Sequence, residues 1–392
     1  MDTMPDHFFN ADTGSQAGAV LQHPDTRKSC IMRIILATSS TNKSGGSRQA
    51  LYLAQGLRQR GHDVTFFTEK KAGLRELDPH MDWGDLPADK RRWRHAVEQA
   101  LPEGRQPRPA IFHAFHNKAV KKAAWWGLLW RRRNVVCVGH RGVVYRPGNP
   151  LPYLSPGIGA FIVNSRACAD VLRWYGVGAC RLHVVYNGIP AGRSTPCRSA
   201  AQALQQLGIH KKDGDVFYGT VAGDNPIKGT EVLLRGFALA RMENARLLVI
   251  GVTPAKWQPL CDELGISRHV TLLGKTECVA DYLQLLDVFV LPSLTESMPN
   301  TLLEAICMGL PAIATRVGGV PELVDNNGML IPAGDHCALS HALRDMHNAP
   351  QQRLRWAAAS RSMAPAYGLE RRVERIEGIY RGLLRRRGLR QD

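Results

Sequence analysis

Short apolar runs alternate with helical patterns along most of the chain. The first run, at residues 32–40, ends in a Ser/Thr/Gly loop; a helical pattern at 50–61 and a second apolar run at 63–68 follow. Apolar runs of this length between helical patterns predict the buried strands of a parallel sheet. The order strand, glycine loop, helix, strand is typical of a doubly wound α/β domain. Further strands of the first half are expected at 110–115, 134–142, 160–165 and 183–189.

The same alternation begins again after a polar stretch at 191–212. That stretch has no regular apolar period and contains Pro196 and several glutamines, so we interpret it as a linker with a short helix. A second α/β series follows, with a helix expected at 230–240 and no repeat of solenoid length. Its strands are expected at 215–223, 246–251, 270–274, 287–293, 311–315 and 328–334.

These patterns divide the chain, which has 392 residues, into five predicted segments. Residues 1–31 are polar and aperiodic, and we expect a disordered extension there. A Rossmann-like domain is expected at 32–190, a linker at 191–212 and a second Rossmann-like domain at 213–368. Residues 369–392 are predicted to form a basic, amphipathic C-terminal helix. The length is sufficient for two domains, each with its own core.

Two carboxylates bracket a loop and a helix in the second series. Glu296 follows the strand expected at 287–293, and Glu304 lies inside a helix expected from about Pro299 to Met308. Proline suits a first helical turn because its missing N–H would have no partner there. Loops at the carboxyl ends of parallel strands bind ligands, and helix N-termini offer free N–H groups to anions. The pattern indicates a polyhydroxylated ligand that carries phosphate.

Three segments of the chain resemble the retaining GT-B glycosyltransferases of family 4. They are VVYNGI at 184–189, VAGDNPIKG at 221–229 and ESMPNTLLEAICMGLPAIATRVGGVPELV at 296–324. The resemblance extends over about residues 32 to 380 and is most specific in the second half. It implies an α/β fold of the GT-B type, with two Rossmann-like domains facing across a cleft and a C-terminal helix that crosses back to the N-terminal domain.

The resemblance also implies a nucleotide-sugar donor held mainly by the C-terminal domain. Lys228 corresponds to the cation on the donor pyrophosphate, Glu296 to the acid at the sugar, and Glu304 to the acid on the ribose hydroxyls. His140 fits the family's position beside the transferring sugar, and would more readily hydrogen-bond a sugar hydroxyl than act as a base. We therefore assign catalysis to Lys228, Glu296 and His140. The expected donor-binding residues are Glu304, Ser297, Met298, Pro299, Asn300, Gly45 and Gly46.

One position departs from the family pattern. The family pairs its lysine with an arginine five residues earlier, where this chain has Gly223. Losing a guanidinium removes a rigid fork of donors that suits phosphate. Either another cation (Arg141, Lys43 or Arg48) replaces it, or the donor binds differently, or activity is weak.

We expect no metal and no cofactor. The leaving nucleotide diphosphate develops negative charge that Lys228 is placed to stabilise, and preorganised charges of this kind often dominate catalysis. Asp213 to Asp215 formally match the D-x-D of metal-dependent transferases, but Asp and Gly are also ordinary turn residues. Retention in the family implies same-face attack assisted by the leaving phosphate, so we name no protein nucleophile.

Each candidate also has a simpler interpretation. The two glutamates would then be solvated acids near a helix start, Lys228 a turn lysine, and Gly45 with Gly46 a plain turn. For six other residues we favour that kind of role: backbone geometry for Gly318 and Gly319, structural histidines for His113 and His116, and a turn without contacts for Asn187 and Gly188.

The charge balance points to anionic partners. Lys and Arg number 51 against 34 Asp and Glu, a net charge of +17. The segment from Lys118 to Arg133 carries six basic residues, three tryptophans and no acid. Basic flanks beside Trp and Leu are typical of an interfacial membrane helix, and the alternative is a core helix with solvated basic residues. We favour membrane contact, and the C-terminal LLRRRGLR supports it.

The nine cysteines are scattered singly along the chain, without C-x-x-C pairs. An odd, dispersed set favours reduced thiols in a cytosolic compartment over a disulfide framework or a zinc site. No secretory signal is visible at the N-terminus, and no stretch approaches the roughly 18 apolar residues that span a bilayer.

Together these features predict a cytoplasmic retaining glycosyltransferase, peripheral on the inner membrane face. It would move a sugar from a nucleotide-diphosphate sugar to a lipid-linked or cell-surface glycan, such as lipopolysaccharide or exopolysaccharide. Three alternatives stay open: a weak or non-catalytic GT-B homologue, a sugar-nucleotide epimerase, and a nucleic-acid-binding protein. Only the charge and the missing arginine favour the last, because no helix-turn-helix, finger or RNP-type motif occurs, and we expect no nucleic-acid partner. The donor base, the sugar and the acceptor are not specified by the sequence.

Overall fold

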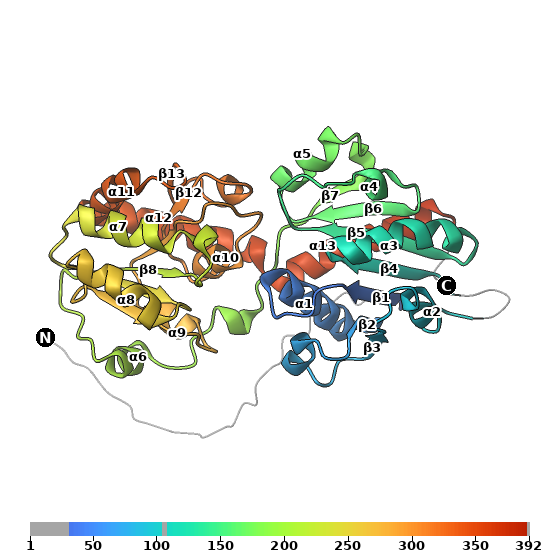
Figure 1. The fold of residues 1–392 in the computed structure, drawn as a ribbon, viewed down its shortest axis with the longest axis horizontal. Helices are drawn as coiled ribbons and strands as arrows, with labels where there is room; N and C mark the ends of the chain where they lie inside the picture. Colours follow the sequence, from blue (N-terminus) through green and yellow to red (C-terminus); the bar gives the residue numbers. More distant parts are fainter. Residues whose placement is uncertain (1–30, 104–107, 390–392) are drawn as a thin grey trace, which may run out of the picture. The chain divides into compact units, whose positions relative to one another are not determined.

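The structure is a computed structural model that describes residues 31–103 and 108–389. The predicted extension at 1–31 therefore lies outside the described residues, apart from Ile31, and so does the end of the predicted C-terminal helix from residue 390. Within the described residues, the chain forms two parallel β-sheets, one in each half of the sequence (Figure 1). This is the two-sheet α/β architecture that the sequence predicts.

The first sheet has seven parallel strands within the described residues, in the order β3-β2-β1-β4-β5-β6-β7. Its strands are β1 (Arg33–Thr38), β2 (Asp63–Glu69), β3 (Trp83–Leu86), β4 (Ala110–Phe115), β5 (Val135–Arg141), β6 (Ile158–Val163) and β7 (Leu182–Val184). The helices of this half are α1 (Gly45–Gln59), α2 (Trp93–Glu98), α3 (His116–Leu129), α4 (Leu151–Leu154) and α5 (Arg166–Trp174), with 3₁₀ turns η1 (Gly73–Leu77), η2 (Trp130–Arg132), η3 (Ala179–Arg181) and η4 (Ala191–Arg193).

The second sheet has six parallel strands within the same described ranges, in the order β10-β9-β8-β11-β12-β13. Its strands are β8 (Val216–Val221), β9 (Ala245–Ile250), β10 (Val270–Leu273), β11 (Val288–Leu291), β12 (Ala312–Thr315) and β13 (Gly328–Ile331). Its helices are α6 (Ala200–Leu207), α7 (Thr230–Ala240), α8 (Pro254–Glu263), α9 (Ala280–Leu283), α10 (Asn300–Cys307), α11 (His336–Asn348) and α12 (Pro350–Met363), with 3₁₀ turns η5 (Pro226–Lys228), η6 (Val320–Glu322) and η7 (Ala364–Tyr367).

The apolar runs become strands because both faces of each sheet are covered. Every residue of β4, β11 and β12 is buried, as expected for central strands with helices on both sides. The sequence analysis missed β3, whose segment WGDL buries only Leu86. β3 is an edge strand and therefore lacks the apolar run by which the central strands were recognised.

The last helix, α13 (Leu369–Arg386), packs against the first sheet although it follows the second one in sequence. Val373, Ile376 and Leu384 join a buried cluster with Ile34 and Leu36 of β1. Figure 1 shows this red helix running along the strands of the first half. The predicted crossing-back of the C-terminal helix is confirmed.

Both sheets reverse their strand order at an inner position. The reversal lies at β1 and β4 in the first sheet and at β8 and β11 in the second. Connections on the two sides of such a point leave in opposite directions, which opens a crevice at the carboxyl ends of the strands. The residues that follow β1, β4, β8 and β11 are therefore the first place to look for a site.

Candidate functional site

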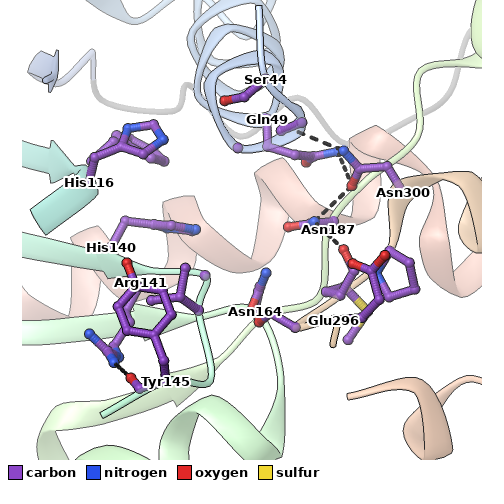
Figure 2. Close-up of a pocket in the computed structure, with 18 of the residues that line it drawn as sticks. Ser44, Gln49, His116, His140, Arg141, Tyr145, Asn164, Asn187, Glu296 and Asn300 are labelled. Atoms are coloured by element: carbon purple, nitrogen blue, oxygen red, sulfur yellow. Dashed lines mark hydrogen bonds between the residues drawn. The ribbon is translucent and has the colours of Figure 1, made fainter. Parts of the chain in front are cut away.

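A cavity of about 560 Å³ lies among the loops at the carboxyl ends of both sheets. Figure 2 shows its side chains, which come from α1, β5 and the loop before α10. Nine of the ten residues assigned to the site from the sequence line it: Gly45, Gly46, His140, Lys228, Glu296, Ser297, Met298, Pro299 and Asn300. Residues not assigned from the sequence also line it, among them Gln49, His116, Arg141, Tyr145, Asn164 and Asn187.

The glycine pair begins α1 at the edge of the cavity. Ser44 caps the helix by accepting a hydrogen bond from the Ser47 N–H at 3.3 Å. A Cβ on Gly45 would lie 2.9 Å from Asn300 Nδ2, and one on Gly46 would lie 3.2 Å from His116 Nε2. The two glycines thus allow side chains from other elements to approach the helix start closely, which a plain surface turn would not require.

Glu296 and Lys228 form an ion pair at the cavity wall. Lys228 Nζ lies 2.7 Å from Glu296 Oε1, and the Ser293 hydroxyl donates to the same oxygen at 3.0 Å. Lys228 is the last residue of the 3₁₀ turn η5, and the Asn225 side chain caps this turn. Gly229 follows at φ +69°, where a Cβ would lie 2.0 Å from the Pro292 carbonyl oxygen. The lysine and the glutamate are therefore held by tight backbone packing between the loops after β8 and β11.

The Glu296 loop rests directly on the Gly318–Gly319 turn. Gly318 has a φ of +50°, and a Cβ there would lie 1.7 Å from the Glu296 carbonyl oxygen. Gly319 donates its N–H to the Ser297 carbonyl at 3.1 Å. These glycines have the backbone role that we favoured from the sequence, and through it they fix the position of the candidate acid.

A hydrogen-bond network crosses from α1 to the start of α10. Asn187 Nδ2 donates to Asn300 Oδ1 at 2.8 Å and to the Met298 carbonyl at 3.3 Å. Gln49 Nε2 donates to the same Asn300 oxygen at 3.3 Å and to the Gly188 carbonyl at 2.9 Å. The expectation that Asn187 and Gly188 make no contacts is wrong, because Asn187 bonds the start of α10 and Gly188 bonds Gln49 of α1. An Asn-Gly pair is so common in turns that sequence alone did not reveal this role.

The start of α10 also differs from the expectation in detail. Pro299 is the N-cap residue, the helix begins at Asn300, and no side chain of the described residues caps it. The neighbouring polar side chains have other partners: Ser297 donates to Asn164 Oδ1 at 2.6 Å, and Asn300 joins the network above. The uncapped N–H groups at this helix start are consequently free to meet an anionic or hydroxyl-bearing ligand.

His113, His116 and His140 cluster near the cavity. Burial lowers the pKa of each, which favours the neutral imidazole. Burial lowers the pKa of His140 well below its ordinary value, and the charges of His113, Arg372 and His116 lower it further. His140 Nδ1 has no hydrogen-bond partner among the described residues. A neutral imidazole with a free nitrogen suits a hydrogen bond to a hydroxyl group. His113 instead bonds Tyr380 of α13 at 2.6 Å, which agrees with a structural role.

His116 was also expected to be structural, yet it lines the cavity. Its Nδ1 lies 2.8 Å from the Thr38 hydroxyl, and its backbone has a φ of +65°. Positive φ is unusual for a residue with a side chain. The strained start of α3 thus turns this ring toward Gly46.

The cations proposed to replace the missing arginine differ in their placement. Arg141 is 2% exposed and lines the cavity, where its guanidinium donates to the Tyr153 hydroxyl and the Tyr145 carbonyl. Lys43 pairs with Glu76 at 2.7 Å, and neither it nor Arg48 lines the cavity. Around Gly223, a Cβ would meet no atom within 4 Å, so the position has room for a side chain.

Glu304 is the one assigned residue that does not line this cavity. It lies inside α10, 4% exposed, and accepts a hydrogen bond from Arg193 Nε at 2.9 Å. Its second oxygen, Oε2, has no partner within the described residues. Burial raises the pKa of Glu304, and the charges of Arg193 and Arg48 oppose that shift. Arg193 lines a second cavity of about 620 Å³ together with the loop that follows β10.

Asp213 to Asp215 lie in the turn before β8. Gly214 has a φ of +89°, and Asp215 Oδ2 accepts the Lys212 N–H at 2.8 Å. These are features of a turn, and the triplet lines neither cavity.

Comparisons with known proteins agree with this architecture. Residues 43–193 match the family model described as Glycosyltransferase Family 4, and residues 215–349 match the model described as Glycosyl transferases group 1. The chain belongs to glycosyltransferase family 4. Both matched ranges contain segments that line the cavity, including the Gly45 turn and the Lys228 and Glu296 loops.

This family 4 protein has relatives among bacterial enzymes. A D-inositol 3-phosphate glycosyltransferase of Streptomyces avermitilis is 27% identical over 87% of this chain and 83% of its own length. A protein of the same name from Corynebacterium urealyticum is 32% identical over 57% of this chain, which spans just over half, 56%, of that relative. The crystal structure of HepE of Anabaena in complex with UDP has a TM-score of 0.77 and 18% identity, and covers 90% of this chain and 100% of that chain. The last likeness establishes the GT-B fold.

Proposed function

We propose that the protein is a retaining glycosyltransferase that moves a sugar from a nucleotide-diphosphate sugar to a hydroxyl-bearing acceptor. The observation that carries the proposal is the Lys228–Glu296 pair, held beside the free N–H groups of α10 in the cavity. One cation, one carboxylate and a helix N-terminus supply the complementary groups for a phosphate and a sugar. The family membership and the UDP complex of the structural neighbour support the same class of donor.

In this proposal the pyrophosphate lies against Lys228 and the N-terminus of α10. As the bond from the sugar to the phosphate breaks, negative charge grows on the leaving oxygen. Lys228 stabilises that charge. An ammonium group fixed in a partly water-excluded site stabilises the negative oxygen more than water does. The helix N-terminus adds a smaller contribution of the same sign.

The carboxylates act at the two ends of the donor. Once the phosphate has replaced Glu296 as the partner of Lys228, Glu296 accepts hydrogen bonds from the sugar hydroxyls. We assign the ribose hydroxyls to Glu304, whose buried Oε2 has no partner among the described residues, while Arg193 holds its other oxygen. His140 is neutral and donates to, or accepts from, a sugar hydroxyl. We assign no protein nucleophile: the acceptor attacks the face that the phosphate leaves, and its proton passes to that phosphate.

We propose a lipid-linked or cell-surface glycan as the acceptor, reached at an anionic membrane surface. Trp125 and Leu129 of α3 are exposed, 65% and 59%, and the basic residues of the same segment flank them. The other two tryptophans of this segment, Trp126 and Trp130, are buried core residues, so only one face of α3 fits an interfacial helix. Among the described residues, no helix is both long and apolar enough to cross a membrane.

The C-terminal helix does not support membrane contact as expected. The apolar face of α13 is buried against the first sheet, where Leu383 and Leu384 join the core. The side chains that it leaves exposed are charged and of both signs, among them Glu370, Glu374 and Arg385. The membrane proposal therefore depends on α3 alone.

The proposal is tested with a thermal-shift screen against UDP-, GDP- and ADP-sugars, followed by measurement of nucleotide release. A bound donor raises the melting temperature by mass action, so a hit identifies the base. Release of the nucleoside diphosphate that depends on an added acceptor is expected of a transferase. Conversion of the sugar without acceptor would favour an epimerase, and binding without turnover would favour a non-catalytic homologue. Salt-sensitive DNA binding without donor binding would refute the proposal.

A further inference from the structure

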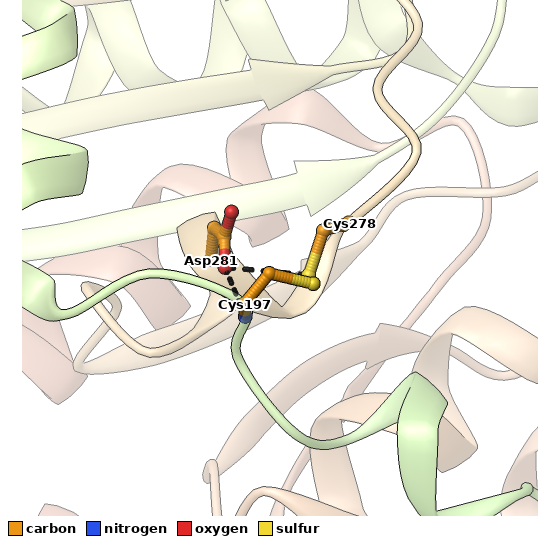
Figure 3. A group of neighbouring side chains, drawn as sticks. All are labelled: Cys197, Cys278 and Asp281. Atoms are coloured by element: carbon orange, nitrogen blue, oxygen red, sulfur yellow. Dashed lines mark hydrogen bonds between the residues drawn. The ribbon is translucent and has the colours of Figure 1, made fainter.

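Two cysteines that are distant in the sequence lie next to each other in the fold. Cys197 is in the linker after η4, and Cys278 is in the loop between β10 and α9. Their sulfur atoms and a carboxylate oxygen of Asp281 all lie within 4.8 Å of one another. Figure 3 shows the two sulfurs side by side. Both cysteines are free thiols, as expected, but their spacing in the sequence did not reveal that the fold brings this pair together.

Asp281 fixes the two backbone segments that carry these thiols. Its side chain is fully buried, and Oδ1 accepts the N–H groups of Cys197 at 2.6 Å and Arg198 at 2.9 Å. The same oxygen accepts the Cys278 thiol at 3.3 Å, and Oδ2 accepts the Arg198 guanidinium at 3.2 Å. The linker and the β10–α9 loop are thus tied together before any covalent bond forms.

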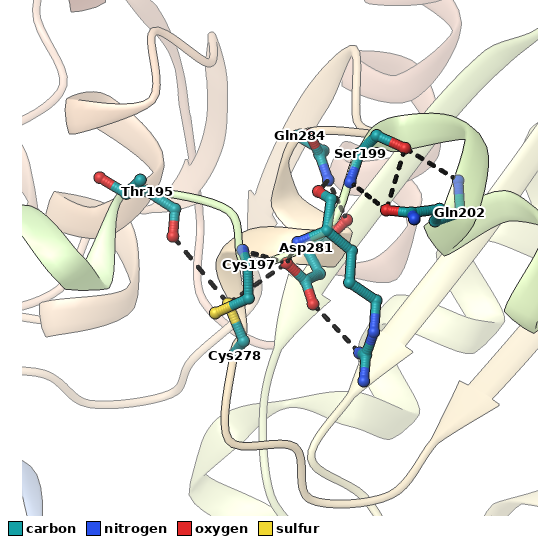
Figure 4. A network of polar contacts seen from close by, with 8 residues as sticks. Thr195, Cys197, Ser199, Gln202, Cys278, Asp281 and Gln284 are labelled. Carbon is teal, nitrogen blue, oxygen red and sulfur yellow. Dashed lines mark hydrogen bonds and ion pairs between the residues drawn. The ribbon is translucent and has the colours of Figure 1, made fainter.

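Further hydrogen bonds hold the linker just after this point (Figure 4). Gln284 Nε2 donates to the Arg198 carbonyl at 2.8 Å. Ser199 and Gln202 form a capping box at the start of α6. The position of Cys197 is consequently fixed relative to Cys278, which favours an intramolecular reaction between them.

We propose that Cys197 and Cys278 form a reversible dithiol–disulfide pair that locks the linker to the β10–α9 loop. A small disulfide such as oxidised glutathione is the oxidant. The Cys197 thiolate attacks one glutathione sulfur, forms a mixed disulfide and releases one reduced glutathione. Cys278 then attacks the Cys197 sulfur, its proton passes to the leaving thiolate, and the second reduced glutathione departs. Two protein thiols and one oxidised glutathione give one protein disulfide and two reduced glutathiones.

Accessibility agrees with this order of attack. Cys197 is exposed and Cys278 is half-buried, so a small oxidant reaches Cys197 first. Burial raises the pKa of Cys278, with further contributions of the same sign from the side chains of Cys197 and Asp281. A raised pKa makes Cys278 the weaker attacking group at the first step, which agrees with the exposed Cys197 reacting first.

The same three residues suit a metal ion less well. A structural zinc ion takes four ligands, and Asp281 already accepts four hydrogen bonds. Giving an oxygen to a metal would leave N–H groups of the linker without an acceptor, which is costly where the acceptor is fully buried. Disulfide formation gives up only thiol hydrogen bonds, such as that from Cys278 to Asp281, and leaves the linker N–H groups with their acceptor.

The test uses the full chain, incubated in glutathione mixtures of rising oxidised fraction, quenched in acid, denatured and labelled with N-ethylmaleimide. We expect a species two hydrogens lighter than the reduced protein, with two fewer maleimide labels and one cross-linked peptide that joins Cys197 to Cys278. Dithiothreitol restores both labels. The oxidised form melts at a higher temperature than the reduced form, because the cross-link restricts the unfolded chain.

Cys197→Ser and Cys278→Ser should each abolish the cross-linked species and the melting shift. Cys337→Ser, at another exposed cysteine, is the matched control and should leave both unchanged. The proposal is overturned if both cysteines stay fully labelled in the most oxidising mixture, or if each ends with its own glutathione. It is equally overturned if the purified protein carries a zinc ion that both single variants lose. These readouts are covalent or structural, so they do not depend on the proposed transferase activity.

Discussion

Lys228 Nζ lies 2.7 Å from Glu296 Oε1, so these two charged groups, both assigned to the donor, neutralise each other in this structure. A donor phosphate must compete with Glu296 for the lysine. When it succeeds, the freed carboxylate gains the capacity to accept hydrogen bonds from the sugar. Binding of the phosphate and recognition of the sugar are thereby coupled through one ion pair.

Replacing Lys228 by Ala should reduce kcat/KM by about 100- to 1000-fold, the usual effect of removing one preorganised stabilising group. The loss should fall mainly on kcat, because the charge on the leaving phosphate is greatest in the transition state. Steady-state kinetics with the donor found in the screen measure it.

Lys90→Ala is the control for overall charge, since Lys90 is exposed and does not line the candidate cavity. Its kinetics should match those of the unmodified protein. Unchanged kcat/KM in Lys228→Ala, with the melting temperature also unchanged, would show that this lysine has no catalytic part.

Gly223 allows the converse test, in which a cation is added to the candidate site instead of removed from it. A Cβ there meets no atom within 4 Å, so Gly223→Arg should be accommodated. If the donor phosphate lies near Lys228, the new guanidinium should lower KM for the donor several-fold, because it adds charge-assisted donors to phosphate. Gly223→Gln has comparable length without the charge and should leave KM unchanged. Equal donor affinity in both variants would place the phosphate elsewhere.

The fold could be predicted because it depends on local patterns. Buried parallel strands such as β4 and β12 read as unbroken apolar runs, and these were recognised. The edge strand β3 was not, because its pairing with β2 comes from tertiary contact and leaves little mark in the segment WGDL. The apolar stripe of α13 was recognised as amphipathic, and the family resemblance placed it on the N-terminal domain.

The site was predictable for Glu296 because it follows a strand end, and for Lys228 because its segment resembles the family motif. It was not predictable where a side chain reaches across the fold. Asn187 and Gln49 meet at Asn300 from segments far apart in sequence, and amide side chains carry no pattern that would announce such a network. Arg193 on Glu304 was missed for the same reason.

Stability should fall as the pH drops below about 6.5, because His113 and His140 are buried in the neutral form. Burial lowers the pKa of both well below 6.5, so the unfolded chain takes up protons before the folded chain does. The stability that these groups contribute is complete above pH 6.5 and is lost as the pH falls toward the folded pKa values. Each histidine adds a slope of up to about 1.4 kcal/mol per pH unit in that window.

Urea unfolding at pH 5, 6, 7 and 8 measures this dependence. His113→Gln should reduce the slope of the unfolding free energy below pH 6.5 by up to about 1.4 kcal/mol per pH unit, because glutamine does not titrate. His80, which is exposed, provides the matched control: His80→Gln should keep the original slope. A slope that is identical in all three proteins would mean that His113 is not held neutral by burial.

Gly318→Ala should destabilise the protein by about 1 to 3 kcal/mol, the range associated with strained backbone positions. The φ of +50° disfavours a side chain, and a Cβ would lie 1.7 Å from the Glu296 carbonyl oxygen, so the loop that carries Glu296 must shift. That shift should also lower kcat, because it moves the candidate acid away from Lys228. Gly148→Ala is the matched control, since a Cβ there meets nothing within 4 Å. Chemical denaturation and kinetics on the two variants separate the effects: a stability loss in Gly318→Ala with full kcat would mean that the turn supports the fold but does not position the acid.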